Sequence, residues 1–347
     1  MKKQTAFPAA LLLSFSLSAC GSSAAAVPSP AASAAPVSSA EAFAPSDPDT
    51  ITIEALDASE SPIQLEVPYN PEKLAVMDLA TLDILDNLDL GDRVVGASTT
   101  SIDYLSSYQD TAANLGNIKE ADLEAVAACE PDLIFIGGRL ASSYDALSEI
   151  APVVLLTTDS SLGVVASTEK NAKTIASIFG LEDQVDSLMS DYQSRIDALK
   201  TVADGQSAII GMCTSGSFNI IGNGGRLSLI VNEVGFTNAG EGYATQRGAS
   251  SDSSSSGSNP HGTESSFELL PELNLDWIFV MDRDSAIGTN GAKLAADIMD
   301  NEIVNSSSAA KEGHLVILEH PAVWYTAEGG ITALGIMISD LEAAMLS

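Results

Sequence analysis

The sequence DLEAVAACEPDLIFIGGR, residues 122–139, aligns without a gap with SFELLPELNLDWIFVMDR, residues 266–283. The two stretches share a glutamate, an aspartate, an Ile-Phe pair and a final arginine, and most other aligned positions are apolar in both. Each copy predicts a short helix, a turn at the aspartate, a buried strand, and an arginine just beyond the strand's carboxyl end. The repeat therefore indicates two related α/β units.

Short apolar runs alternate with helical periods on both sides of this repeat. Period-two patterns over residues 51–56 and 63–67 predict an opening β-hairpin. Buried strands are expected at 74–77, 94–96, 133–136, 153–156, 207–212, 218–221, 277–280 and 315–318. Buried strands with helices between them are typical of a parallel α/β layer structure.

Residues 166–203 differ, because their apolar side chains recur at helical spacing. Gly180 is expected to split this segment into two helices, the second running from Glu182 to Lys200. We therefore predict an α/β protein with two Rossmann-like lobes, residues 50–165 and 204–347, joined by one long α-helix. Ligands of open α/β sheets bind beyond the carboxyl ends of the strands, so a ligand cleft is expected between the lobes.

The N-terminal residues have the pattern of an export signal. Two lysines precede an apolar stretch that is too short to span a bilayer, and Leu17-Ser-Ala-Cys20 follows. We expect residues 1–19 to be a signal peptide and Cys20 to be lipidated. The Ala/Ser/Pro-rich residues 20–49 are expected to form a flexible tether.

The charge balance excludes some partners. The formal net charge is −32, which argues against binding to nucleic acid or anionic lipid. Cys129 and Cys213 lie in separate halves, and we interpret them as buried free thiols, although a disulfide between them stays an open alternative.

The chain has six arginines, and three of them are candidate ligand residues. Arg139 follows two glycines, Arg226 follows Gly-Asn-Gly-Gly, and Arg283 occupies the position of Arg139 in the repeat. Three guanidiniums converging on one cleft would form an anion site in a negative protein. The alternative is three separate salt bridges. Arg93 and Arg195 are interpreted as surface or structural charges.

Other candidate residues leave alternatives open. His261 follows the serine-rich stretch 248–259 and would either line the cleft mouth or cap a turn. Trp324 is expected in the core, and Tyr325 in the core or the cleft. The histidines have no metal-ligand spacing, and no phosphate-binding loop or nucleophile elbow occurs. We therefore expect no metal, no cofactor and no enzyme activity.

At the level of motifs, the chain from about residue 50 onward resembles the siderophore-binding lipoproteins of bacterial ABC importers. The branch concerned binds ferric catecholate or mixed catecholate complexes such as petrobactin and bacillibactin. The motifs that carry the resemblance are Arg93–Ala97, Asn114-Leu-Gly, Asp122-Leu-Glu, Pro131–Arg139, Gly224-Gly-Arg226, Phe279–Gly288, Trp324-Tyr325 and Gly329-Gly330. The serine-rich stretch 248–259 is longer than the family pattern.

The resemblance implies a monomeric two-lobed receptor that closes by a small hinge. It places the family's arginine triad on Arg139, Arg226 and Arg283, and a histidine and a tyrosine of the site on His261 and Tyr325. It also places an acidic residue for docking onto the permease on each lobe, at Glu124 and Glu268. The implied partners are a ferric siderophore, the ABC permease and ATPase subunits, and the membrane through the lipid anchor.

Two other functions are compatible with these residues. A haem receptor of the same fold would use His261 and Tyr325 as axial ligands, and a cobalamin or another chelate would be a related cargo. A signalling or adhesion lipoprotein would use the fold without transport.

Overall fold

The computed structural model describes residues 49–247, 263–264 and 267–347. The expected signal peptide, Cys20, nearly all of the tether, the serine-rich stretch 248–259 and His261 lie outside these residues. No helix in the described part is long and apolar enough to cross a membrane.

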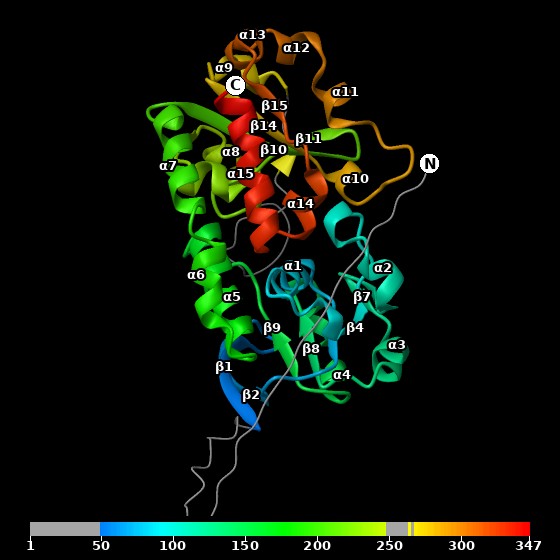
Figure 1. Ribbon diagram of the computed structural model, residues 1–347. Coiled ribbons are helices and arrows are strands. Elements are labelled where there is room, and N and C mark those ends of the chain that lie inside the picture. Colours follow the sequence, from blue (N-terminus) through cyan, green and yellow to red (C-terminus); the bar gives the residue numbers. More distant parts are fainter. Residues whose placement is uncertain (1–48, 248–262, 265–266) are drawn as a thin grey trace, which may run out of the picture. The chain divides into compact units, whose positions relative to one another are not determined.

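The N-terminal lobe is built on a seven-stranded sheet (Figure 1). The predicted opening hairpin is confirmed, since β1 (Thr50–Leu56) and β2 (Pro62–Pro68) pair in antiparallel register. The strand order is β2-β1-β9-β8-β3-β4-β5, and the strands from β9 to β5 run parallel. The remaining strands are β3 (Leu74–Val76), β4 (Val94–Ala97), β5 (Ala113–Asn114), β8 (Leu133–Ile136) and β9 (Val153–Leu155), with a separate ribbon of β6 (Gly116–Asn117) and β7 (Glu120–Ala121).

The C-terminal lobe contains the second sheet, in the order β13-β11-β10-β14-β15, with β12 also pairing with β10. The strands β10, β14 and β15 run parallel, whereas β11 is antiparallel to β10. Their bounds are β10 (Ser207–Thr214), β11 (Ser217–Ile220), β12 (Thr237–Asn238), β13 (Thr263–Glu264), β14 (Trp277–Asp282) and β15 (Leu315–Ile317). The predicted α/β class with parallel sheets is therefore confirmed.

Helices connect the strands of both lobes. The N-terminal lobe has α1 (Leu79–Asn87), α2 (Tyr108–Thr111), α3 (Leu123–Ala128) and α4 (Tyr144–Ser148). The lobes are joined through α5 (Val164–Ser177), α6 (Glu182–Leu188) and α7 (Tyr192–Ala203). The C-terminal lobe has α8 (Glu241–Arg247), α9 (Leu269–Glu272), α10 (Arg283–Ala286), α11 (Ala295–Met299), α12 (Glu302–Asn305), α13 (Ser308–Glu312), α14 (Pro321–Thr326) and α15 (Ile331–Met345).

The sequence repeat corresponds to a structural repeat. In the N-terminal lobe, the Asp132 carboxylate accepts the backbone N–H groups of Glu72 and Lys73, both at 2.9 Å, just before β3. In the C-terminal lobe, the Asp276 carboxylate accepts the N–H of Ser207 at 2.7 Å, where β10 begins. Each aspartate precedes a central strand and fixes the start of its parallel neighbour.

The central strands of both repeats are buried on both faces, which explains their continuous apolar runs. In β8, Leu133 and Phe135 contribute to one hydrophobic cluster, and the two isoleucines between and after them contribute to another. In β14, Trp277 and Phe279 belong to the same cluster as Leu133 and Phe135. One hydrophobic core therefore runs from one lobe into the other.

The connecting segment is helical, but it differs from the prediction in one respect. α5 ends at Ser177 and Gly180 has a φ of +66°, as expected for a break that favours glycine. The single helix predicted from Glu182 to Lys200 is wrong, because the chain breaks again between α6 and α7 (Figure 1). The hydroxyl of Ser190 donates to the carbonyl of Ser187 at 2.9 Å, and such side-chain bonds compete with the helical backbone.

Two carboxylates, buried Asp83 and half-buried Glu233, cap helices from distant parts of the chain. Asp83 in α1 accepts the N–H groups of Thr332 and Ala333, both at 2.9 Å, at the start of α15. Glu233 of the C-terminal lobe accepts the N–H groups of Val164 and Val165, also at 2.9 Å, at the start of α5. Anionic groups at helix N-termini are stabilising, so these contacts fasten the lobes to each other.

Candidate functional site

Each of the two repeated strands, β8 and β14, is followed by an arginine that lies between the lobes. Arg139 lies in the short helical turn that follows β8 and two glycines. Arg283 is the first residue of α10, directly after β14, and Asp282 caps this helix by accepting the N–H of Ser285 at 2.9 Å. Both arginines thus lie beyond the carboxyl ends of their strands, as the repeat predicted.

The first of the two glycines before Arg139, Gly137, is required by a close approach. A Cβ atom added to Gly137 would lie 2.5 Å from Oδ1 of Asp78, which occupies the N-cap of α1. The backbone therefore passes directly against this half-buried carboxylate. The turn brings Arg139 toward the C-terminal lobe.

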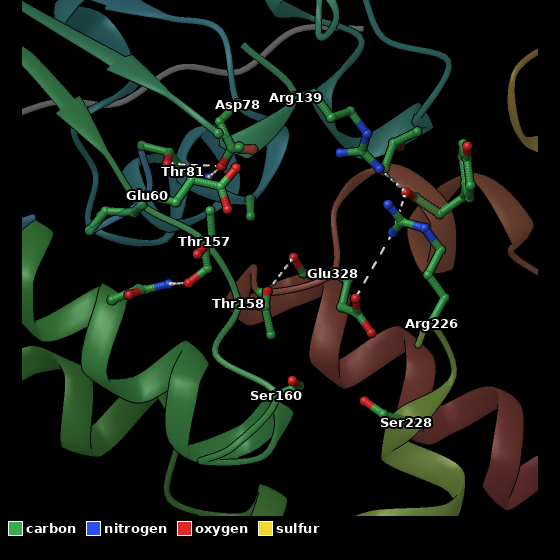
Figure 2. A pocket seen from close by; sticks show the side chains of 18 of the residues that line it. Glu60, Asp78, Thr81, Arg139, Thr157, Thr158, Ser160, Arg226, Ser228 and Glu328 are labelled. Carbon is green, nitrogen blue, oxygen red and sulfur yellow. Dashed lines mark hydrogen bonds and ion pairs between the residues drawn. The ribbon is translucent and has the colours of Figure 1, made fainter. Parts of the chain in front are cut away.

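The guanidinium groups of Arg139 and Arg226 point toward each other (Figure 2), and both donate to the backbone of Tyr325. Nη2 of Arg139 donates to the carbonyl oxygen of Tyr325 at 2.7 Å, and Nη1 of Arg226 donates to the same oxygen at 2.9 Å. Arg226 comes from the glycine-rich loop after β11, so guanidiniums of two lobes share one backbone acceptor.

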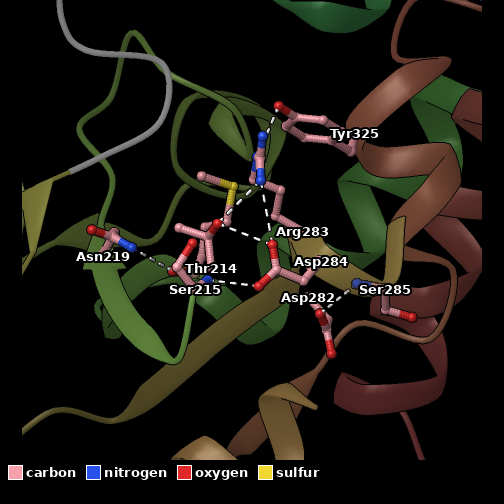
Figure 3. A network of polar contacts seen from close by, with 9 residues as sticks. Thr214, Ser215, Asn219, Asp282, Arg283, Asp284, Ser285 and Tyr325 are labelled. Atoms are coloured by element: carbon pink, nitrogen blue, oxygen red, sulfur yellow. Dashed lines mark hydrogen bonds and ion pairs between the residues drawn. The ribbon is translucent and has the colours of Figure 1, made fainter. Parts of the chain in front are cut away.

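Arg283 reaches the other end of Tyr325 (Figure 3). Its Nε donates to the phenol oxygen at 3.2 Å, and its Nη1 donates to the hydroxyl of Thr214, also at 3.2 Å. The same Nη1 lies 3.3 Å from the carboxylate of Asp284, which also accepts the N–H of Ser215. Asp284 is buried and provides a counter-ion for Arg283.

The ring of Tyr325 is surrounded by the three guanidiniums. The guanidinium carbons of Arg139, Arg226 and Arg283 lie 5.5, 4.5 and 5.5 Å from the ring centroid, within the range of cation–π attraction. Tyr325 is 1% exposed and packs in the core. Its ring also contacts the three guanidiniums, so both interpretations of this residue hold. Trp324 is buried, as predicted.

A cavity of about 400 Å³ adjoins this cluster and is lined by both lobes. Its charged lining consists of Arg139 and Arg226 together with Glu60, Asp78 and Glu328. Burial and the neighbouring Arg139 lower the pKa of the Arg226 guanidinium. Burial raises the pKa values of the carboxyl groups of Asp78 and Glu328. The cationic side of the cavity is formed by Arg139 and Arg226, whereas Arg283 does not line it.

Four acidic residues at this site were not predicted from the sequence: Glu60, Asp78, Asp284 and Glu328. Asp284 lies within the motif Phe279–Gly288, and Glu328 lies between the motifs Trp324-Tyr325 and Gly329-Gly330. Glu60 and Asp78 had no comparable signal. Single carboxylates among 47 acidic residues cannot be recognised without the fold.

The other candidates are placed as follows. Glu124 lies in the first turn of α3 and Glu268 at the start of α9, and both side chains are exposed at matching positions of the repeat. Their role in docking stays a prediction, as does ligand binding by the arginines. Cys129 and Cys213 are free thiols. His261 and Cys20 lie outside the described residues.

One group among the described residues has the spacing of metal ligands: Glu319, His320 and Asp340. Asp340 already accepts hydrogen bonds from Trp324 Nε1 at 2.8 Å and from the backbone N–H of His320 at 3.2 Å, and its other oxygen lies 2.7 Å from Nδ1 of His320. These contacts connect α14 to α15 and give Asp340 a structural role.

The fold and site define a class of protein. Two α/β lobes, a helical connection, and a cavity lined from both lobes are the features of a bilobed solute-binding protein. In agreement with this, the family model described as periplasmic binding protein matches residues 74–322, and the chain belongs to that family. The family consists of substrate-binding proteins, so the chain is not an enzyme.

Within this family, the chain is similar to known siderophore-binding proteins. The petrobactin-binding protein YclQ of Bacillus subtilis is 31% identical over 281 residues, which cover 80% of this chain and 83% of YclQ. The crystal structure of YclQ gives a TM-score of 0.74 at 30% identity and covers 86% of this chain and 99% of YclQ. The catecholate-siderophore binding protein VctP from Vibrio cholerae gives a TM-score of 0.71 at 27% identity, with 85% and 99% covered. The predicted resemblance to siderophore-binding proteins is therefore confirmed.

Proposed function

We propose that this protein binds an anionic ferric siderophore of the catecholate class and delivers it to an ABC importer. The observation that carries the proposal is the meeting of Arg139, Arg226 and Arg283 around Tyr325, beside a cavity lined by both lobes. In a chain with a net charge of −32, three gathered guanidiniums form a local anion site.

The chemistry of the cargo matches this cluster. A ferric tris-catecholate is a bulky trianion with flat aromatic faces. Guanidinium groups donate paired hydrogen bonds to oxygen atoms and stack on aromatic rings. They can neutralise the chelate and bond its iron-bound oxygens from outside, without replacing a ligand of the iron. The names of YclQ and VctP, a petrobactin-binding and a catecholate-siderophore binding protein, support this cargo.

The position of Tyr325 favours a siderophore over haem. Its ring is 1% exposed, and its phenol oxygen accepts a hydrogen bond from Arg283 at 3.2 Å. An axial haem ligand would have to leave both environments. Binding of an entering anion by the arginines does not require Tyr325 to leave the core.

Delivery requires contact with a permease at a membrane. We propose that the exposed Glu124 and Glu268, one on each lobe, dock onto basic residues of the permease. We also propose that Cys20, lipidated after removal of residues 1–19, holds the protein as a monomer on the outer face of the cytoplasmic membrane. Residues 20–49 would then form the flexible tether between the lipidated Cys20 and the folded lobes.

Titration of the full-length chain in detergent tests the cargo. The probe is the ferric complex of a hexadentate tris-catecholamide, and the readout is quenching of tryptophan fluorescence, because Trp324 adjoins Tyr325. We expect saturable quenching with one chelate per chain, and none with ferric citrate at equal iron concentration. Quenching by hemin with a new Soret band, and none by the chelate, would overturn the proposal in favour of haem.

A further inference from the structure

Glu328 is the one acidic residue whose carboxylate approaches Arg226 in the described structure. It lies between the end of α14 and the start of α15, and its Oε2 is 4.0 Å from Nη1 of Arg226 (Figure 2). The side chains of Glu328 and Arg226 are 14% and 16% exposed. This ion pair therefore lies in a largely desolvated wall of the cavity.

The pair is incompletely satisfied. Oε1 of Glu328 and Nε of Arg226 are both buried, and within the described residues neither has a hydrogen-bond partner. Buried polar atoms in native structures are usually paired. Both side chains line the same cavity, so a ligand atom or a proton could supply what the pair lacks.

The charges around Glu328 come from three elements. Arg226, in the loop after β11, and Arg139, in the turn after β8, both favour the ionised carboxylate. Glu233, in the helical segment 229–233 that precedes β12, disfavours it, and burial disfavours it more than any other influence. The ionised form therefore depends on the two guanidiniums.

An entering trianion would compete for these same guanidiniums. Arg226 would turn its donors to the chelate, and three negative charges would lie close to the carboxylate. A buried carboxylate without a nearby positive charge is costly, and such groups commonly bind a proton instead. We propose that Glu328 takes up a proton from solvent when the anionic chelate enters the cavity, so that ligand capture is coupled to protonation of this carboxylate.

The coupling rests on the proposed function and adds a specificity device to it. The proton passes from solvent to one carboxylate oxygen, and the complex gains one positive charge per proton bound. The protonated carboxyl can donate a hydrogen bond, so Glu328 changes from a competitor of the anion to a donor at the edge of the site. A neutral ligand would not drive this change.

Calorimetric titration of the full-length chain with the ferric tris-catecholamide measures the coupling. Runs at about pH 7 in phosphate and in Tris, whose ionisation enthalpies differ, give the number of protons taken up per chelate. We expect wild type to take up more protons than Glu328→Gln, by a difference of up to one. We also expect the wild-type Kd to weaken by up to about tenfold for each pH unit between about pH 6.5 and 8.5, and the Glu328→Gln value to change less.

Protonation of the chelate itself is common to both proteins and cancels in the comparison. Glu342→Gln is the matched control, because Glu342 also pairs with an arginine, Arg195 at 2.7 Å, but does not line the cavity. This variant should take up as many protons as wild type. If Glu328→Gln does not fold, Glu328→Asp keeps a titratable group and should retain proton uptake.

Three outcomes would overturn the inference, and one of them also overturns the proposed function. Equal proton uptake by wild type and Glu328→Gln would make Glu328 a fixed counter-ion. Loss of proton uptake in Glu328→Asp, with binding retained, would contradict a role for the carboxylate. Absence of any binding of the chelate by wild type would remove the proposed function and the coupling together.

Discussion

Arg139 and Arg226 reach the same backbone oxygen from opposite lobes, at 2.7 and 2.9 Å from the carbonyl of Tyr325. Two guanidiniums repel each other at such a distance unless negative charge compensates them. Here the compensation comes from the carbonyl, the face of the Tyr325 ring and the partly satisfied Glu328. A bound anion would complete this arrangement and hold the two lobes together.

Removal of an arginine from the cluster should weaken ligand binding. Charged hydrogen bonds contribute roughly 1.5 to 3 kcal/mol each, so Arg226→Ala or Arg283→Ala should raise the Kd for a ferric tris-catecholate about tenfold to a hundredfold. Fluorescence quenching measures the change. Arg195→Ala is the control, because Arg195 pairs with Glu342 away from the cavity. Unchanged affinity in both cluster variants would contradict the assignment of these residues.

The stability of the fold should depend on pH through Asp83. This carboxyl is buried, and burial raises its pKa to about 6 in the folded protein, from 3.8 as the ordinary value. Because the pKa of Asp83 is higher in the folded than in the unfolded protein, a proton on Asp83 stabilises the folded state. This stabilisation is fully present below about pH 4. That contribution is lost as the pH rises through about 6, by up to about 3 kcal/mol.

Comparison with Asp83→Asn isolates this effect from other titrating groups. The free energy of unfolding of the asparagine variant, relative to wild type, should increase by up to about 3 kcal/mol between about pH 4 and pH 7.5. Urea denaturation at a series of pH values measures it. A difference that is independent of pH would show that Asp83 keeps an ordinary pKa.

The exposed glutamates should affect delivery without affecting capture. Glu124→Ala combined with Glu268→Ala leaves the cavity intact, so the Kd for the chelate should equal the wild-type value. Uptake of radioactive iron by cells that depend on this receptor should fall severalfold. Glu272→Ala serves as the control, because Glu272 is also an exposed glutamate and lies at the end of α9, the helix that Glu268 precedes. Normal uptake by the double variant would exclude these two residues as docking contacts.

Anchoring should depend on Cys20. Cys20→Ser should be released into the medium or should keep residues 1–19, because serine cannot carry the thioether-linked lipid. Fractionation of cells followed by mass determination of the N-terminus measures both outcomes. Membrane retention of a processed serine variant would show that another segment provides the anchor.

Local patterns predicted much of the fold. The apolar runs at β8 and β14 are strands because both faces of each sheet are covered, and the aspartates before them recur because each fixes the neighbouring strand. The arginine after each of these strands followed from the same repeat. These features depend on residues that lie close together in the chain.

Other features depend on contacts across the chain and were not predictable. Asp83 caps α15 across 249 and 250 residues, and no local pattern marks it as a cap. At the break between α6 and α7 the hydroxyl of Ser190 donates to the carbonyl of Ser187, but serine is also compatible with a continuous helix. Glu328 could be recognised as a site residue only from the fold, which places it beside Arg226.

The arginine cluster is proposed to select its cargo by negative charge. The most direct test measures, by fluorescence quenching, the affinity of the full-length wild-type chain for two ferric chelates of similar size. One is a trianionic tris-catecholamide, and the other is a neutral tris-hydroxamate. We expect the trianion to bind at least about a hundredfold more tightly, since it engages two or more additional charged hydrogen bonds. Equal affinity for the two chelates would contradict this proposal.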